Sequence, residues 1–136
     1  MMSLTHSALA VATVAVGIGT ADPYVLATAA IAAQIPDIDT TESFSGRLIW
    51  PLTNFLEQRF PHRSLTHSFM ASGLVVVLSL PLLWINWQLF LAAVVGYFVG
   101  WFSDAFTKSG VEAFYPNPAR LVIPGNPRAR LDTGSP

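Results

Sequence analysis

Four apolar runs separated by short polar clusters organise this chain. The runs cover residues 7–20, 23–35, 69–85 and 87–106. A helix needs about 20 apolar residues to cross a bilayer, so the last two runs predict membrane-spanning helices. The first two runs are shorter and alanine-rich, and they predict either spans packed behind the others or buried half-length helices. The pattern therefore predicts an all-α fold, a small membrane bundle of about four apolar helices that run up and down.

The first run has a second interpretation, as a cleaved signal peptide. Thr20 and Ala21, just before Asp22, resemble a cleavage region. However, a signal peptide normally starts with a basic segment, and residues 1–7 contain no lysine or arginine. We therefore prefer a membrane helix for this run.

The composition supports a membrane protein. Charged residues make up only 11% of the 136 residues, whereas a soluble domain carries roughly 25%. Lipid would cover the surface that so few charges cannot solvate, so we expect membrane lipids as partners. The net charge of −1 offers no attraction to nucleic acid, and none is expected as a partner. The sequence leaves the oligomeric state open.

Two segments fall outside the four runs. Residues 40–60 place apolar side chains near helical spacing, namely Leu48, Leu52, Phe55, Leu56 and Phe60. They predict an amphipathic helix that either lies in the headgroup region or caps the end of the bundle. Residues 116–136 contain five prolines, which predict an extended tail because proline at this density forbids a helix. We therefore divide the chain into a helical membrane domain with the candidate site, residues 1–115, and this tail.

The basic residues gather on one side of the predicted bundle. The turns near Asp22 and Asn86 contain no lysine or arginine. All seven basic residues lie on the opposite side, in the central segment or beyond the last run: Arg47, Arg59, Arg63, Lys108, Arg120, Arg128 and Arg130. Because basic residues favour the cytoplasmic side, the pattern predicts a multi-pass protein of a bacterial-type inner membrane. Both termini and the candidate site would face the cytoplasm.

Side chains able to bind metal stand at the ends of the runs. Up-and-down threading brings five of them to the cytoplasmic face: His6, Asp37, Asp39, His67 and Asp104. Imidazole and carboxylate ligands without any thiolate suit zinc or manganese, so we expect a divalent metal ion at this face. His6 alone would be an ordinary surface residue, and only the shared face makes it a candidate.

Asp37 and Asp39 follow Pro36, which ends the preceding helix. Carboxylates two residues apart point in different directions in an extended segment. One could bind the ion while the other orients a histidine, or the two could bridge two ions. Alternatively, both only end the helix through Asx turns.

His62 and His67 are five residues apart, which would place them about 140° apart on a helix. One rigid helix could not aim both at an ion. If the helix instead begins near Ser64 or Thr66, with one of them as its cap, His62 is free in the loop and can approach the ion. Otherwise they are ordinary interfacial histidines. Arg63 could hold an anion or pair with a carboxylate of the preceding cluster.

Asp104 ends the last run beside Gly96 and Gly100. Two glycines four residues apart predict close packing of another helix on this face. Asp104 would then point into the bundle, either as a ligand or as a carboxylate paired with Arg63 or Lys108. A carboxylate left unpaired there would be costly.

Together these clusters resemble the YdjM-like family, small inner-membrane proteins regarded as metal-dependent hydrolases. The resemblance runs from His6 to about Pro116 and rests on Pro36-Asp37-Ile38-Asp39, His62-Arg63-Ser64-Leu65-Thr66-His67-Ser68, and Gly96-Tyr97 leading to Asp104. The family has a histidine four residues before the last aspartate, where this chain has Gly100. That difference puts a second metal ion, or catalysis itself, in question. The small residue could instead admit water or a substrate headgroup.

The resemblance implies a metal-dependent hydrolase in the membrane. A distant similarity to zinc-dependent phospholipase C and P1-type nucleases points to an amphiphilic or lipid-linked phosphoester as substrate. The expected metal ligands are His6, Asp37, Asp39, His62, His67 and Asp104, and the expected catalytic residues are Asp39, Arg63 and His67. The ion would lower the pKa of bound water, and Arg63 would stabilise developing charge.

The alternative is a catalytically inactive membrane scaffold or lipid-binding protein. Its polar cluster would then be a structural ion site or a salt-bridge network that ties the helix ends together. An ion carrier is disfavoured, because the ionisable groups gather at one face and none lies in the middle of an apolar run.

Overall fold

The computed structural model describes residues 3–39, 44–59, 65–106, 111 and 113–115, and every regular element in these ranges is helical. The all-α prediction is therefore confirmed for this part of the chain. The longer helices are α1 (Ser3–Val14), α2 (Pro23–Ala32), α3 (Phe44–Leu48), α4 (Trp50–Arg59), α5 (Phe69–Ser79) and α6 (Trp87–Phe102). The predicted tail, residues 116–136, lies outside the described residues, so the division into two regions stays a prediction.

Five short 3₁₀ or π helices extend or connect these elements. They are η1 (Ala15–Gly19), η2 (Ile35–Asp39), η3 (Leu65–His67), η4 (Leu80–Trp84) and η5 (Ser103–Phe106). Three of them carry candidate metal ligands: Asp37 lies in η2, His67 in η3 and Asp104 in η5. The polar clusters therefore form tight helical turns at the ends of the long helices.

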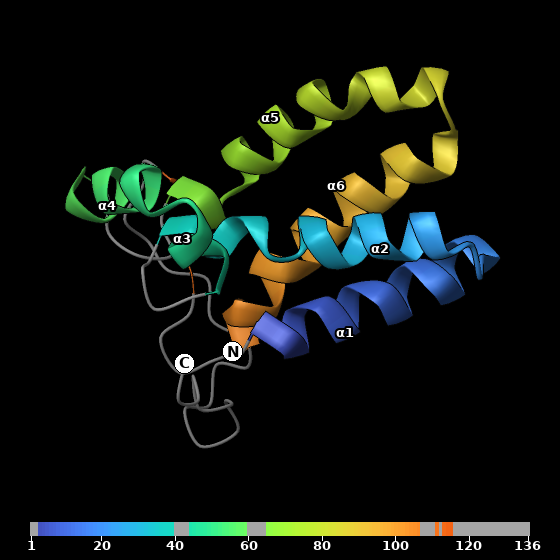
Figure 1. Ribbon diagram of the computed structural model, residues 1–136, viewed down its shortest axis with the longest axis horizontal. Helices are drawn as coiled ribbons and strands as arrows, with labels where there is room; N and C mark the ends of the chain where they lie inside the picture. The colour runs from blue at the N-terminus through green and yellow to red at the C-terminus, as the bar shows by residue number, and fades with distance from the viewer. Residues whose placement is uncertain (1–2, 40–43, 60–64, 107–110, 112, 116–136) are drawn as a thin grey trace.

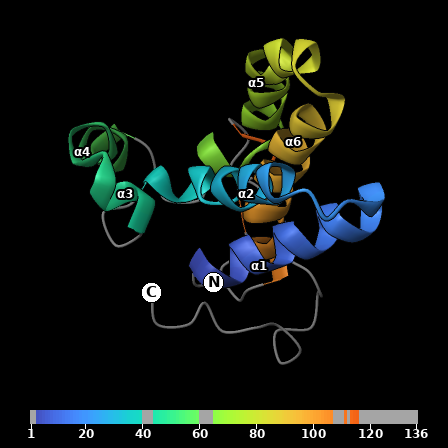
Figure 2. The same ribbon diagram turned by 45° about the vertical axis from the view of Figure 1, so that its right-hand side comes forward.

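α6 is the central helix of the bundle. It packs against α1, α2 and α5, and α1 also packs against α2. Figures 1 and 2 show α5 on one side of α6 and the α1–α2 pair on the other. The short helices α3 and α4 contact η2 and project from the end of the bundle where the chain begins (Figure 1).

Polar caps fix where the apolar helices begin. Asp22 accepts a hydrogen bond from the backbone N–H of Tyr24 at the start of α2, and Asn86 accepts one from Gln88 at the start of α6. At the other end of the bundle, Ser68 caps α5 by accepting from Ala71 at 3.2 Å. The idea that this helix begins near Ser64 or Thr66 is wrong, because His67 still belongs to η3 and Ser68 provides the cap.

α6 continues into η5 as one apolar segment, Trp87–Phe106, whose 20 residues are long enough to cross a bilayer. The apolar segments Leu4–Gly19 and Phe69–Trp84 are shorter. The arrangement as four membrane-spanning helices therefore stays a prediction. Large apolar side chains are exposed along the outer side of α5 and in η4, as lipid contact requires: Leu74, Val77, Leu78 and Trp84.

α2 and α6 approach each other closely through Gly96 and Gly100. A Cβ atom built on Gly96 would lie 2.6 Å from the carbonyl oxygen of Ala29, and one on Gly100 would lie 2.5 Å from that of Ala33. The backbone of α2 therefore fills the space beside both glycines, as the glycine spacing predicts. The idea that Gly100 admits water or a headgroup is wrong, because Ala33 occupies that space.

α4 presents apolar side chains outward. Trp50, Leu52 and Phe55 are exposed, whereas Thr53 is fully buried. The guanidinium of Arg59 lies 5.2 Å from the centre of the Phe55 ring. A helix that capped the bundle would bury its apolar side chains, so the exposed set favours the prediction of a helix at the membrane interface.

Gly100→Ala tests the close contact between α2 and α6. We expect it to lower the free energy of unfolding by about 1–3 kcal/mol, because the added methyl group must push the helices apart. Thermal and denaturant unfolding in detergent micelles measure the change. Gly73→Ala is the matched control, since Gly73 lies within α5 and has no atom within 4 Å of an added Cβ. Equal stabilities for Gly100→Ala and wild type would contradict this packing.

Candidate metal centre

Four side chains from four separate elements meet at one end of the bundle. His6 lies at the end of the first turn of α1, Asp37 in η2, His67 in η3 and Asp104 in η5. His6 and His67 are fully buried, and the exposed fractions of Asp37 and Asp104 are 6% and 1%. The structure therefore brings together four of the six predicted ligands in a site closed to solvent.

The two aspartates follow the close helix contact in the chain. Asp37 lies four residues beyond Ala33, and Asp104 lies four residues beyond Gly100. α2 and α6 run in parallel here, because Ala29 and Ala33 face Gly96 and Gly100 in the same order. α2 ends at Ala32 and the chain turns into η2 before Asp37, so each aspartate lies shortly beyond the close contact between α2 and α6.

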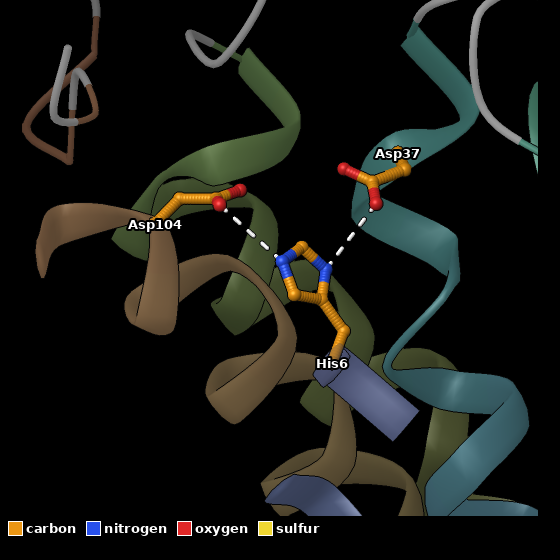
Figure 3. A group of neighbouring side chains, drawn as sticks. All are labelled: His6, Asp37 and Asp104. Atoms are coloured by element: carbon orange, nitrogen blue, oxygen red, sulfur yellow. Dashed lines mark hydrogen bonds and ion pairs between the residues drawn. The ribbon is translucent and has the colours of Figure 1, made fainter. Parts of the chain in front are cut away.

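His6 lies between the two carboxylates (Figure 3). Its Nδ1 is 3.2 Å from Asp37 Oδ2, and its Nε2 is 3.3 Å from Asp104 Oδ1. The Nε2 contact is a hydrogen bond, whereas Nδ1 is buried and lacks a partner with hydrogen-bond geometry. His6 therefore joins α1 to both aspartates and leaves one ring nitrogen without a well-aligned partner.

His67 faces the other oxygen of each carboxylate. Its Nε2 lies 3.1 Å from Asp104 Oδ2 and 3.6 Å from Asp37 Oδ1. Each aspartate thus shares its two oxygens between two imidazoles. The four side chains form a closed ring in the order His6, Asp37, His67, Asp104.

The histidines control the ionisation of Asp37. Burial by itself would raise the pKa of this carboxyl, but the close contacts with the imidazoles of His6 and His67, together with their charges, lower it to about 2. Asp37 is therefore ionised at neutral pH. Two buried carboxylates need positive charge beside them, from protonated imidazole or from a bound cation.

A second set of contacts supports His67 from behind. Thr66 Oγ1 lies 3.1 Å from His67 Nδ1, and the hydroxyl of Tyr97 donates to the carbonyl oxygen of Thr66 at 2.6 Å. The sequence alone assigned Thr66 to helix capping and gave Tyr97 no role. The sequence did contain one indication that Tyr97 belongs to the site. It precedes Asp104 by seven residues, about two helical turns, so the two residues lie on nearly the same side of this helical segment.

The chemistry and spacing of the site fit a divalent metal ion. His6, Asp37 and Asp104 each offer a ligand atom, and these atoms lie within 4.8 Å of one another. The incompletely satisfied Nδ1 of His6 also suits a site with room for a cation. The group could therefore hold a metal ion, although the choice of metal is open.

The other predicted site residues are not placed by this geometry. The backbone of Asp39 ends η2, but its side chain lies outside what the structure describes. His62 and Arg63 lie in residues 60–64, outside the described ranges. Lys108, in residues 107–110, also lies outside them. Their assignments as ligands, catalytic residues or ion-pair partners stay predictions.

Asp37→Asn tests the electrostatics of the ring in protein freed of metal by a chelator. The pKa of Asp37 is about 2 in the folded protein, against an ordinary value of 3.8. A carboxyl with a lowered pKa stabilises the fold above its ordinary pKa, and this stability is lost as the pH falls through the folded value. We expect the variant to be less stable than wild type by about 2 kcal/mol at neutral pH, with the gap closing between about pH 4 and pH 2.

Denaturant unfolding in micelles across this pH range measures the gap. Glu57→Gln is the control, because Glu57 is an exposed carboxylate on α4 and its loss should change stability little at any pH. A pH-independent difference between Asp37→Asn and wild type would contradict the assignment.

Comparison with known proteins identifies the family. No curated protein and no solved structure matches this chain. The family described as YdjM inner membrane protein matches residues 1–132, nearly the whole chain. This result agrees with the motifs and with the apolar segment Trp87–Phe106. The chain therefore belongs to the YdjM inner membrane protein family.

Proposed function

We propose that this protein is a membrane-bound, metal-dependent hydrolase of amphiphilic or lipid-linked phosphoesters. The observation that carries the proposal is the buried ring of His6, Asp37, His67 and Asp104, drawn from four distant parts of the chain. A structural salt bridge between two helix ends needs only one cation and one carboxylate. Here two histidines each contact both aspartates, which is more than such a salt bridge requires. A metal ion does need nitrogen and oxygen ligands converging in a shielded site.

Zinc or manganese would be held by ligands drawn from these four residues; with one position left open, it would lower the pKa of a bound water and polarise a phosphoryl oxygen. Asp37 and Asp104 supply negative charge that offsets the charge of the cation. Because each carboxylate has two oxygens, one can bind while the other holds an imidazole in place. Asp39, His62 and Arg63 are further candidates from the same two motifs, and Arg63 is the candidate for stabilising charge on a phosphoryl group.

The membrane setting supports an amphiphilic substrate. We propose four membrane-spanning helices with the termini and the metal centre on the cytoplasmic side, because all seven basic residues fall on that side of the apolar runs. α3 and α4 would lie in the headgroup region of the same leaflet, with Trp50, Leu52 and Phe55 in contact with lipid. α4 contacts η2, which carries Asp37, so a lipid headgroup would lie near the centre.

A catalytically inactive scaffold is the second candidate. The observation in its favour is that the ring already closes through direct contacts between histidine and aspartate. Such a network could tie α1, η2, η3 and η5 together with or without an ion. The metal-binding and hydrolysis experiments below distinguish it from an enzyme.

Asp104→Asn tests the metal-dependent function, since it keeps the shape of the side chain and removes a charged ligand. We expect purified wild type to contain zinc or manganese, and the variant to lose at least about 10-fold in metal affinity. Hydrolysis of bis(p-nitrophenyl) phosphate and of phospholipid vesicles should fall with it. Glu57→Gln is the control and should keep both metal and activity.

The outcomes separate the two candidates. Folded wild-type protein that binds neither zinc nor manganese would exclude the metal-dependent enzyme. Bound metal with no hydrolysis, and a large drop in melting temperature when a chelator removes it, would support the scaffold with a structural ion.

The topology can be tested by single-cysteine labelling, because the natural chain has no cysteine. Ile85 is 73% exposed in the turn between η4 and α6, and Glu57 is exposed on α4. We expect an impermeant maleimide to label Ile85→Cys in intact spheroplasts and Glu57→Cys only after lysis. Labelling in the reverse order, or of both in intact cells, would contradict cytoplasmic sidedness.

A further inference from the structure

We propose that Thr66 and Tyr97 are positioning residues that hold His67 with its Nε2 directed at the metal ion, an inference that rests on the proposed function. Tyr97 on α6 donates its hydroxyl to the carbonyl oxygen of Thr66 at 2.6 Å. The hydroxyl of Thr66 lies 3.1 Å from His67 Nδ1. The three residues form a continuous chain of contacts from the central helix to the imidazole.

The two ring nitrogens of His67 face different surroundings. Nε2 faces oxygens of Asp104 and Asp37, whereas Nδ1 faces the Thr66 hydroxyl. An imidazole that binds metal through one nitrogen carries a proton on the other and donates it to a neighbouring acceptor. Thr66 Oγ1 is such an acceptor. With a metal ion bound to Nε2, Nδ1–H would donate to Thr66; without an ion, Nε2–H donates to Asp104 Oδ2.

Tyr97 gives this arrangement its rigidity. η3 contains only three residues, so it has few hydrogen bonds of its own to fix its position. The bond from Tyr97 ties η3 to α6, and α6 leads directly into the turn that carries Asp104. One helix therefore sets the position of both the imidazole and its carboxylate partner. His6 has no equivalent support, since both of its nitrogens face carboxylates.

The test measures zinc affinity of the full-length protein in detergent micelles, by calorimetric titration against a competing chelator. We expect Thr66→Val and Tyr97→Phe each to weaken zinc binding by about 10- to 100-fold, the usual effect of losing such a supporting contact. Thr66→Ser keeps the hydroxyl and should restore wild-type affinity. Wild-type affinity in both Thr66→Val and Tyr97→Phe would overturn the inference.

Ser72→Ala separates positioning from general docking of α5 on α6. Ser72 Oγ accepts a 2.7 Å hydrogen bond from Trp101 Nε1, so this variant also breaks a partly buried bond between the two helices, but one that does not involve the imidazole. We expect it to lower the melting temperature and leave zinc affinity unchanged. If Ser72→Ala and Tyr97→Phe weaken zinc binding equally, the effect is only loss of helix docking and the inference fails.

The nuclear magnetic resonance spectrum of ring-¹⁵N histidine in the zinc-loaded protein gives a second readout. We expect a slowly exchanging Nδ1–H signal from His67 in wild type and Thr66→Ser, and its loss in Thr66→Val. An unprotonated Nδ1 in zinc-loaded wild type would overturn the inference alone. A wild type that binds no zinc would overturn the proposed function, and the inference with it.

Discussion

The site depends on keeping two carboxylates close together where water is excluded. Asp37 and Asp104 repel each other, and burial strengthens that repulsion. His6 and His67 offset it by each contacting an oxygen of both aspartates. The same histidines connect α1 and η3 to the ends of α2 and α6. Removing any member of the ring therefore affects both the charge balance and the packing of four chain segments.

The two carboxylates lie shortly beyond a close backbone contact between α2 and α6. Ala33 and Gly100 are in such close contact that no side chain fits between them, and Asp37 and Asp104 each lie four residues further along the chain. A histidine at position 100 could not occupy the space where the backbone of Ala33 lies. This chain therefore has a close helix contact at the position where the YdjM-like pattern has an imidazole. The imidazoles of the candidate site come instead from other segments, as His6 and His67.

Much of this site follows from the sequence because its residues stand at the ends of apolar runs. If successive apolar helices alternate in direction, His6, Asp37, His67 and Asp104 all fall at one end of the bundle. This prediction needs no knowledge of side-chain positions. The sequence could not show that Ser68 caps α5, or that Ala33 fills the space beside Gly100. Those features depend on distances between segments that are remote in the chain, and such distances are decided by packing. The role of Thr66 was missed for the same reason, since a hydroxyl beside a helix start also fits a cap.

α6 explains how a short membrane protein can hold its site rigidly. Its glycines contact α2, while Tyr97 and Trp101 donate hydrogen bonds toward the start of α5, and its C-terminal end leads to Asp104. Because these contacts lie on different faces of one apolar helix, a shift of α6 in the bilayer would move the carboxylate and the support of His67 together. A movement of α6 relative to its neighbouring helices would change the distances between the histidines and aspartates, whereas a movement of the whole bundle would not. The helix that is long and apolar enough to cross a membrane therefore also positions the candidate site.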